Sequence, residues 1–359
     1  MTHSTTRLRV SLGQFVSRFG LLFLGAVLVL AFSIALPDTF PTSTTARSIV
    51  DAQVVVALLA LAETIVVIVG EFDLSVGYMI GLTHILTIGL IVRDGMPWGL
   101  SVFLVVAIGA LVGLINGVLV HIAQIDSFIA TLGVGTIAYA GSNWYTSQQQ
   151  VTGRLSTGFL DIYAKKVFGL PISAIYVLVL VALMWLVLEY TPTGRYLYAL
   201  GSNRRAAELS GIRARRYVIG AFVVSGAIVA VAGVVLASRL RIGDVGNGPD
   251  YLLPTFVGAM LGATSVKPGR ANPSGTLVAV GILGIGIAGF QQLGGSTEFI
   301  VPLFNGTTLV LGVGLAGYTA RRVRRVRRAK AGTETETPPP AAAAPSDASY
   351  HQMSDQRLL

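Results

Sequence analysis

The feature that most constrains this chain is a series of long apolar runs, each separated from the next by a short polar or glycine-rich break. The runs are roughly 15–23 residues long, close to the ~20 that a helix needs to cross the hydrocarbon core of a bilayer. Such helices satisfy their backbone hydrogen bonds internally, as lipid demands. The chain is 53% hydrophobic and only 12% charged, unlike an ordinary soluble domain of 359 residues. We therefore expect an all-α polytopic membrane protein.

About ten spans are expected, and they set the domain layout. Residues 1–18 form a cytoplasmic N-terminus, 19–320 the transmembrane domain, and 321–359 a basic and then disordered tail. A basic segment precedes the first run, as in a signal peptide, but no convincing cleavage motif follows it and further spans come next. The expected spans cover 21–36, 52–70, a third run ending at 92, 98–120, 127–147, 171–188, 218–238, 251–265, 275–293 and 299–318.

The basic residues predict the orientation of these spans. Ten spans place both termini on one side, and most of the 26 Lys and Arg residues then share that side. Because basic loops stay in the cytoplasm, both termini are expected there. The net charge of +9 does not favour nucleic-acid binding, since the basic residues lie between spans. The cluster at 321–330 is expected to contact anionic membrane lipid.

A polar island at residues 189–217 interrupts the apolar runs near the middle of the chain. We expect Thr193-Gly194 to break the preceding helix. Ser202 or Asn203 can cap a short helix that runs to Leu209, and Gly211 can stop it. A short amphipathic helix on a cytoplasmic loop suits docking to another protein. The alternative is a basic loop that only sets orientation.

Several polar residues are expected at membrane depth. Glu63 lies within the second span, where an acid is costly and should face the bundle interior. Asp73 lies in the break that follows. Asn116 lies beside a stripe of Gly109, Gly113 and Gly117, which favours close helix packing over a path lining. Glu63 is either a partnered buried acid or a path residue, and Asn116 either links two helices by a hydrogen bond or contacts substrate.

A weak internal repeat appears when the chain is shifted so that Asp73 meets Asp244. The same shift aligns Phe128-Ile129 with Phe299-Ile300 and Gly135-Thr136 with Gly306-Thr307. It spans five helices, so the two copies have opposite orientations. This is typical of an inverted-repeat transporter with discontinuous helices at the path. Asp73 and Asp244 would then be equivalent positions; chance in an apolar composition is the alternative.

The chain offers few residues for chemistry. It has no Cys, and its four His residues show no metal-ligand spacing. The phosphate-binding pattern G-x-x-x-x-G-K-[ST] is absent, so ATP hydrolysis is expected on another chain. An enzyme is therefore the least favoured class.

Four segments resemble ribose-type ABC import permeases of the branched-chain/monosaccharide class. They occur in family order between about residues 50 and 320: GEFDLSVG at 70–77, GLING at 113–117, DSFIATLG at 126–133, and TGR with ALGSN and AAxxSGI across 193–212. The last segment is similar to the family's cytoplasmic coupling segment. Three departures are Glu71 for a usual glycine, Asp126 for a usual proline, and an unusual stretch at 250–254.

The resemblance implies a type II-like ABC importer permease in the bacterial plasma (inner) membrane, working by alternating access. A second permease copy, identical or paralogous, would pair with it. Two ATPase subunits would bring ATP-Mg, so no cofactor is expected in this chain. An extracellular binding protein would deliver a monosaccharide or related small polar solute.

Within that resemblance, residues 191–216 form the cytoplasmic coupling loop. Its expected ATPase-coupling residues are Gly201, Ser202, Asn203, Arg204, Arg205, Ala206, Ala207, Glu208 and Gly211, and the expected path residues are Glu63, Asp73, Asn116 and Asp244. Two rivals remain. One is a secondary transporter driven by H⁺ or Na⁺ through the buried acids, and the other is a membrane scaffold with no path.

Overall fold

The computed structural model describes residues 4–167, 170–267, 269–294 and 298–310, and the side chains of this part from residue 20 onward. The described residues belong to one unit of residues 1–313. The basic cluster at 321–330, the tail and the last part of the tenth expected span lie outside the described residues.

The described chain is almost entirely helical. A two-residue pairing of β1 (Lys166–Val167) with β2 (Leu170–Pro171) is the sheet that this part contains. Two 3-10 turns, η1 (Val245–Asn247) and η2 (Pro249–Tyr251), precede a short helix. The helices are α1 (Ser4–Ala35), α2 (Ser43–Ile68), α3 (Val76–Val92), α4 (Trp98–His121), α5 (Ser127–Thr146), α6 (Thr157–Ala164), α7 (Ile172–Tyr190), α8 (Pro192–Ser202), α9 (Arg204–Leu209), α10 (Ala214–Leu240), α11 (Leu252–Gly262) and α12 (Pro273–Gln292), with a further helix over Glu298–Val310.

Helix α2 lies at the centre of the bundle. It packs against α7, α10, α11 and α12, and an uninterrupted run from Val54 to Val66 is buried. A helix that is apolar on every side is stable only when other elements surround it. This run explains why α2 can carry Glu63 at 0% exposure.

Helices α4, α5 and α7 form the periphery and present large apolar side chains outward. Examples are Phe103 on α4, Ile137 on α5 and Leu183 on α7, all exposed. An outward apolar face on helices of this length is typical of contact with lipid tails. Among the described residues, five helices are long and apolar enough to cross a membrane: α2, α4, α7, α10 and α12. Shorter apolar helices in this part cover Gly20–Ala35, Val76–Val92 and Glu298–Val310.

The glycine stripe of α4 packs directly against α10. A Cβ at Gly113 would lie 2.2 Å from the carbonyl oxygen of Phe222, and one at Gly109 would lie 2.5 Å from that of Gly226. Only glycine permits such a close backbone approach between two helices. The packing role predicted for this stripe is confirmed.

Several helices begin or end at residues other than the predicted ones. Helix α2 begins at Ser43, well before the expected start at residue 52. The side chain of Thr42 caps it by accepting from Thr45 N, and this cap lets the polar residues that follow adopt helical geometry. The Thr193-Gly194 break is also wrong, since α8 begins at Pro192 with Thr191 as its cap. The polar connection between α5 and α7 contains the short helix α6 and the β1–β2 pair. The segment expected as the eighth span contains α11, which is only 11 residues long.

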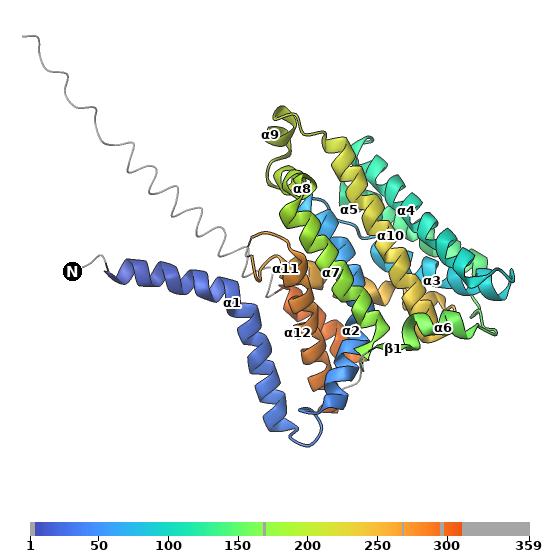
Figure 1. The fold of residues 1–359 in the computed structure, drawn as a ribbon, viewed down its shortest axis with the longest axis horizontal. Coiled ribbons are helices and arrows are strands. Elements are labelled where there is room, and N and C mark those ends of the chain that lie inside the picture. The colour runs from blue at the N-terminus through green and yellow to red at the C-terminus, as the bar shows by residue number, and fades with distance from the viewer. Residues whose placement is uncertain (1–3, 168–169, 268, 295–297, 311–359) are drawn as a thin grey trace, which may run out of the picture. The chain divides into compact units, whose positions relative to one another are not determined.

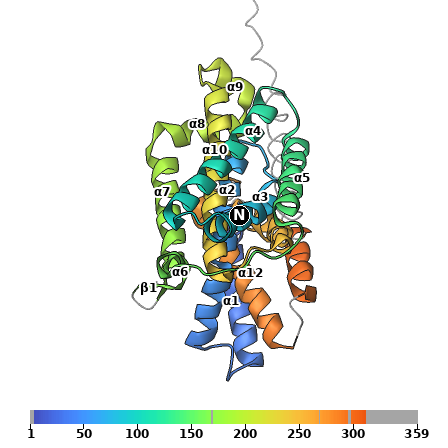
Figure 2. The same ribbon diagram turned by 90° about the vertical axis from the view of Figure 1, so that its right-hand side faces the viewer.

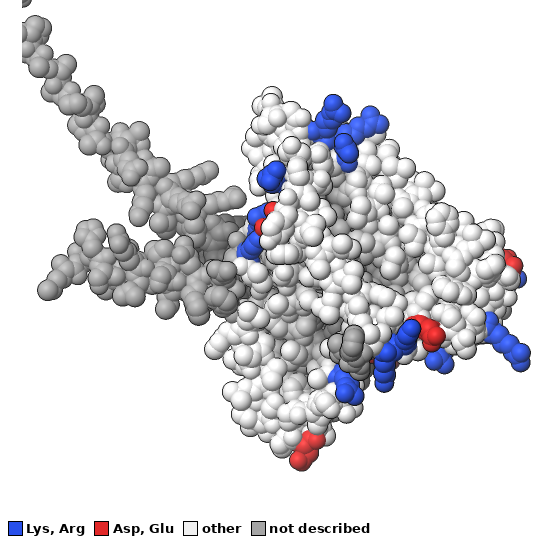
Figure 3. Space-filling view, viewed as in Figure 1, with Lys and Arg blue, Asp and Glu red and all other residues white. Residues whose placement is uncertain are grey.

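The two ends of the bundle differ in content. Helices α8 and α9 lie at one end, beside the start of α10, and α6 and β1 lie at the opposite end (Figures 1 and 2). On the face drawn in Figure 3, charged side chains gather at these two ends and the surface between them is largely uncharged. This distribution fits a helical bundle whose middle is in contact with lipid.

Candidate functional site

The break between α2 and α3 is an irregular segment buried inside the bundle. Gly70 has φ +86°, a left-handed conformation that ends α2 at little cost only for glycine. The N–H of Glu71 still donates to the carbonyl oxygen of Val66 in α2, but the N–H groups of Phe72 and Leu74 lie beyond the helix, and an unpaired N–H in an apolar interior is costly. Side chains of another helix therefore accept hydrogen bonds from these N–H groups. Ser127 Oγ accepts from Phe72 N at 3.2 Å, and Thr131 Oγ1 accepts from Leu74 N at 2.9 Å.

Glu63, on α2, also accepts a hydrogen bond from the backbone of this segment. Its Oε1 accepts from the backbone N of Asp73 at 3.2 Å, while its Oε2 has no hydrogen-bond partner among the described residues. A carboxyl group at 0% exposure with one unsatisfied oxygen is costly to maintain in an apolar interior. Such a group in a membrane bundle is expected to have a functional reason.

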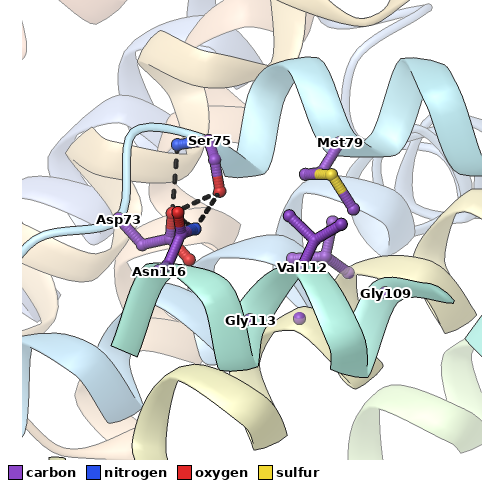
Figure 4. Close-up of a pocket in the computed structure, with 9 residues that line it drawn as sticks. Asp73, Ser75, Met79, Gly109, Val112, Gly113 and Asn116 are labelled. Atoms are coloured by element: carbon purple, nitrogen blue, oxygen red, sulfur yellow. Dashed lines mark hydrogen bonds between the residues drawn. The ribbon is translucent and has the colours of Figure 1, made fainter. Parts of the chain in front are cut away.

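Asp73 anchors a small hydrogen-bonded cluster. Its Oδ1 accepts from Ser75 N at 3.0 Å and from Ser75 Oγ at 2.5 Å, which closes a local turn at the start of α3. Asn116 joins from α4, donating through Nδ2 to Ser75 Oγ at 2.9 Å and to Asp73 Oδ1 at 3.4 Å. Figure 4 shows the three side chains converging between α3 and α4. The cluster links the break to a second helix.

A small pocket lies next to this cluster, between α3, α4 and α10. Asp73, Ser75 and Asn116 form its polar end, and apolar side chains and glycines form the rest: Met79, Gly109, Val112, Gly113, Gly226 and Val229. Asn116 Oδ1 has no partner among the described residues. In this conformation the close contact of α4 with α10 keeps the pocket narrow.

Asp244 is not part of that cluster. It precedes η1, is half-buried, and its Oδ2 accepts from Gln150 Nε2 at 2.7 Å near the surface. Its backbone N donates to Nε2 of His84, whose Nδ1 is 3.1 Å from the carbonyl oxygen of Gly81. The second break therefore contacts the middle of α3, whereas Asp73 precedes the start of α3.

The predicted short helix of the polar island is present as α9. Asn203 Oδ1 accepts from Ala206 N at 3.0 Å, which makes Asn203 the cap. Gly211 has φ +86°, as expected of a glycine that ends a helix. The nine expected coupling residues therefore lie in one structural segment, at the C-terminal end of α8, along α9 and just after it.

Helix α9 has one inward and one outward face. Ala207 is buried, and Arg204 turns inward to Glu71, with Nη1 2.8 Å from Oε1. Arg205, Glu208 and Leu209 are exposed, and Leu209 is 83% exposed. The outward face of α9 thus carries one large apolar side chain between charged ones.

Sequence reasoning missed several of these residues. Ser127 and Thr131 lie one helical turn apart on α5, a spacing that puts both hydroxyls on one face. Leu209 is the single large apolar side chain of α9, which is the signal that marks it. The departures from the family pattern have local roles: Asp126 caps α5 by accepting from Phe128 N at 3.0 Å, and Glu71 pairs with Arg204.

Among the described residues, no group of three or more His, Asp or Glu is placed to hold a metal ion. The buried acids and the amide are held by backbone and hydroxyl partners, and the polar segment of α8 and α9 is suited to contact rather than to chemistry. The arrangement is that of a helical bundle with an internal polar cluster and an exposed, charged segment at α8 and α9.

Comparison with known proteins assigns the bundle. The family model described as the permease component of the branched-chain amino acid transport system matches residues 46–311. The ribose import permease of Haemophilus influenzae is 32% identical over 72% of this chain and 80% of its own length. That of Bacillus subtilis is 33% identical over 66% and 76%, and the fructose import permease of Rhizobium meliloti is 28% identical over 80% and 81%. No solved structure gives a significant match. The chain therefore belongs to this permease family, on the branch that resembles the ribose-type ABC importer permeases.

Proposed function

We propose that this chain is the transmembrane subunit of an ATP-driven importer that moves a monosaccharide or a related small polar solute into the cell by alternating access. The family match and the sugar import permeases among its relatives support this assignment. The chain itself is not an enzyme, and ATP-Mg binds on a separate ATPase subunit.

The proposal extends to the fold in the membrane. Ten spans are arranged as two inverted five-helix halves, with both termini in the cytoplasm of a bacterial inner membrane. The shared turn at Asp73 and Asp244 supports the repeat, since each carboxylate accepts from the backbone N two residues later. The basic character of the α9–α10 end supports its cytoplasmic orientation.

The exposed face of α9 is the single observation that carries the proposal. A second permease copy pairs with this chain, and each copy presents α9 to an ATPase subunit. Leu209 fills an apolar site in the groove of the ATPase, and Arg205 and Glu208 provide charged contacts around it. Exposed ion pairs contribute only ~0–1 kcal/mol each, whereas burial of the Leu209 side chain in the complex can contribute about 1.5–3 kcal/mol, so the leucine is the larger contribution.

The solute path includes the polar cluster at the break. Glu63 comes from α2, Asp73 from the first break and Asn116 from α4. Asp244 comes from the second break, whose backbone contacts His84 in the middle of α3. A binding protein on the outer side delivers the solute. Opening of the α4–α10 contact gives access to the pocket, which is closed in this conformation.

A pull-down from mild detergent tests the function. The wild-type chain is compared with Leu209→Asp and with the double variant Arg205→Glu/Glu208→Arg. An ATPase and a sugar-binding protein are expected with the wild type, and both variants are expected to lose the ATPase alone. Arg154→Gln is the control, because Arg154 is an exposed arginine in the connection between α5 and α6, outside the coupling loop at residues 191–216.

Two outcomes would contradict the proposal. No ATPase with the wild type under any condition would remove the ATP-driven mechanism. Uptake that persists without ATP and collapses with the ion gradient would favour an ion-coupled secondary transporter using Glu63 or Asp73.

A further inference from the structure

The two faces of α9 differ in what they contact, and the inward face reaches the buried break. Arg204 is adjacent to Arg205 in sequence, yet its guanidinium points into the bundle. Its Nη1 is 2.8 Å from Glu71 Oε1, and the exposed fractions of the two side chains are 34% and 14%. Arg204 Nη2 also contacts Nδ1 of His121, at the end of α4. A half-buried pair of this geometry is screened less by solvent than an exposed one.

Both partners of Arg204 are attached to the polar cluster. Glu71 lies two residues before Asp73, in the same break. His121 ends α4, and Asn116, which bonds to Ser75 and Asp73, lies in the last two turns of that helix. One guanidinium thus joins the two segments that meet at the cluster.

The backbone of the same region is in direct contact. Gly201, at the end of α8, lies so close to the end of α2 that a Cβ there would be 2.0 Å from the carbonyl oxygen of Ile68. Gly70 is in ordinary van der Waals contact with the same glycine, with 3.4 Å between its ideal Cβ and the Cα of Gly201. The end of α8 is therefore in direct backbone contact with the end of α2 and the start of the break. Rigid packed contacts of this kind transmit small movements.

We propose that Arg204 and Glu71 are positioning residues that transmit movement of α9 to the Asp73 cluster, and that they take no part in binding the ATPase. This inference rests on the proposed function, which supplies the ATPase that moves α9. Arg205, Glu208 and Leu209 are exposed and face the partner. The guanidinium of Arg204 reaches Glu71 in the break through Nη1, while its Nε lies 3.7 Å from Oε1 of Glu208. When α9 moves, the Arg204–Glu71 ion pair moves the break with it. The hydrogen bonds of Asn116 to Ser75 and Asp73 then transmit this movement to α4.

Cysteine labelling can test this without knowledge of the solute. The natural chain has no cysteine, so a single one reports without background. Met79→Cys places the reporter in the pocket beside Asp73, and Val112→Cys gives a second reporter on α4. The rate of reaction with N-ethylmaleimide is measured on the complex with its ATPase, with and without ATP and vanadate.

Glu71→Gln and Arg204→Gln are expected to keep the ATPase bound but to reduce the nucleotide-dependent change in labelling rate about five- to tenfold, the low end of measured allosteric couplings. The charge swap Glu71→Arg/Arg204→Glu is expected to restore the response. Arg154→Gln changes an exposed arginine outside the coupling loop and is expected to leave the response unchanged.

The outcomes separate this inference from the proposed function. A wild-type chain that binds no ATPase overturns both. If the wild type binds ATPase and responds to nucleotide, an unchanged response in Glu71→Gln and Arg204→Gln overturns the inference alone. Loss of the ATPase in Arg204→Gln, or a wild-type complex whose pocket reporters ignore nucleotide, also overturns it.

Discussion

The two breaks at Asp73 and Asp244 share a local turn but differ in their surroundings. Each aspartate accepts through Oδ1 from the backbone N two residues later, at 3.0 Å for Ser75 and 2.9 Å for Gly246. Asp73 is 2% exposed and bonds to side chains, while Asp244 is half-buried and bonds to Gln150 near the surface. The same local chemistry therefore produces a buried cluster at one break and a surface turn at the other.

The difference follows from the helices that pack around each break. Ser127 and Thr131 of α5 and Glu63 of α2 serve the backbone of the first break. At the second break, His84 Nε2 accepts from the backbone N of Asp244, and Gly243 pairs with Val151, the residue after Gln150, in a β-bridge. Water can replace lost partners at the second break but not at the first. Substitutions are therefore expected to cost more at the first break.

The largest effect is expected from truncation of the aspartates. Asp73→Ala removes the acceptor of Ser75 N and leaves buried donors unpaired, so it should lower the stability by about 2–4 kcal/mol. Asp244→Ala should cost no more than about 1 kcal/mol, because its carboxylate is near solvent. Thermal unfolding in detergent measures both. Asp73→Asn, which keeps Oδ1, is the control, and equal losses at the two aspartates would show that the breaks are equivalent.

The next effect is expected from the helix that delivers Asn116. A Cβ at Gly113 meets the Phe222 carbonyl, so Gly113→Ala must move α4 away from α10 at a cost of about 1–3 kcal/mol. Gly220→Ala is the matched control, since nothing lies within 4 Å of a Cβ there. Hydrogen exchange should increase at the amides of Leu74 and Ser75 and stay constant at Gly246. Faster exchange at both breaks would contradict an independent second break.

The smallest effect is expected at Glu63. Glu63→Gln keeps an acceptor for Asp73 N and should change stability little, whereas Glu63→Ala removes it and should cost about 1 kcal/mol. The cost stays modest because interhelical hydrogen bonds in membranes average ~0.6 kcal/mol. Thermal unfolding of the two variants decides between them. A loss in Glu63→Gln as large as that in Glu63→Ala would show that the charge, and not the hydrogen bond, holds the break.

Local features were accessible from the sequence. The cap at Asn203, the stop at Gly211, the break at Gly70 and the packing stripe of α4 depend on residues within a few positions of one another. Boundaries were less accessible, because a cap such as Thr42 extends a helix into polar sequence that composition assigns to a loop.

The sequence by itself determined that this chain forms apolar helices interrupted at Asp73 and Asp244, with a capped polar segment between them. Only the tertiary structure decided that Asp73 meets Glu63 and Asn116, that Asp244 remains near the surface, and that Arg204 turns inward while Leu209 turns outward. The physical reason is the sequence separation over which the interactions act. Caps, turns and helix lengths arise from neighbours along the chain, whereas burial and long-range pairing depend on which helices pack together.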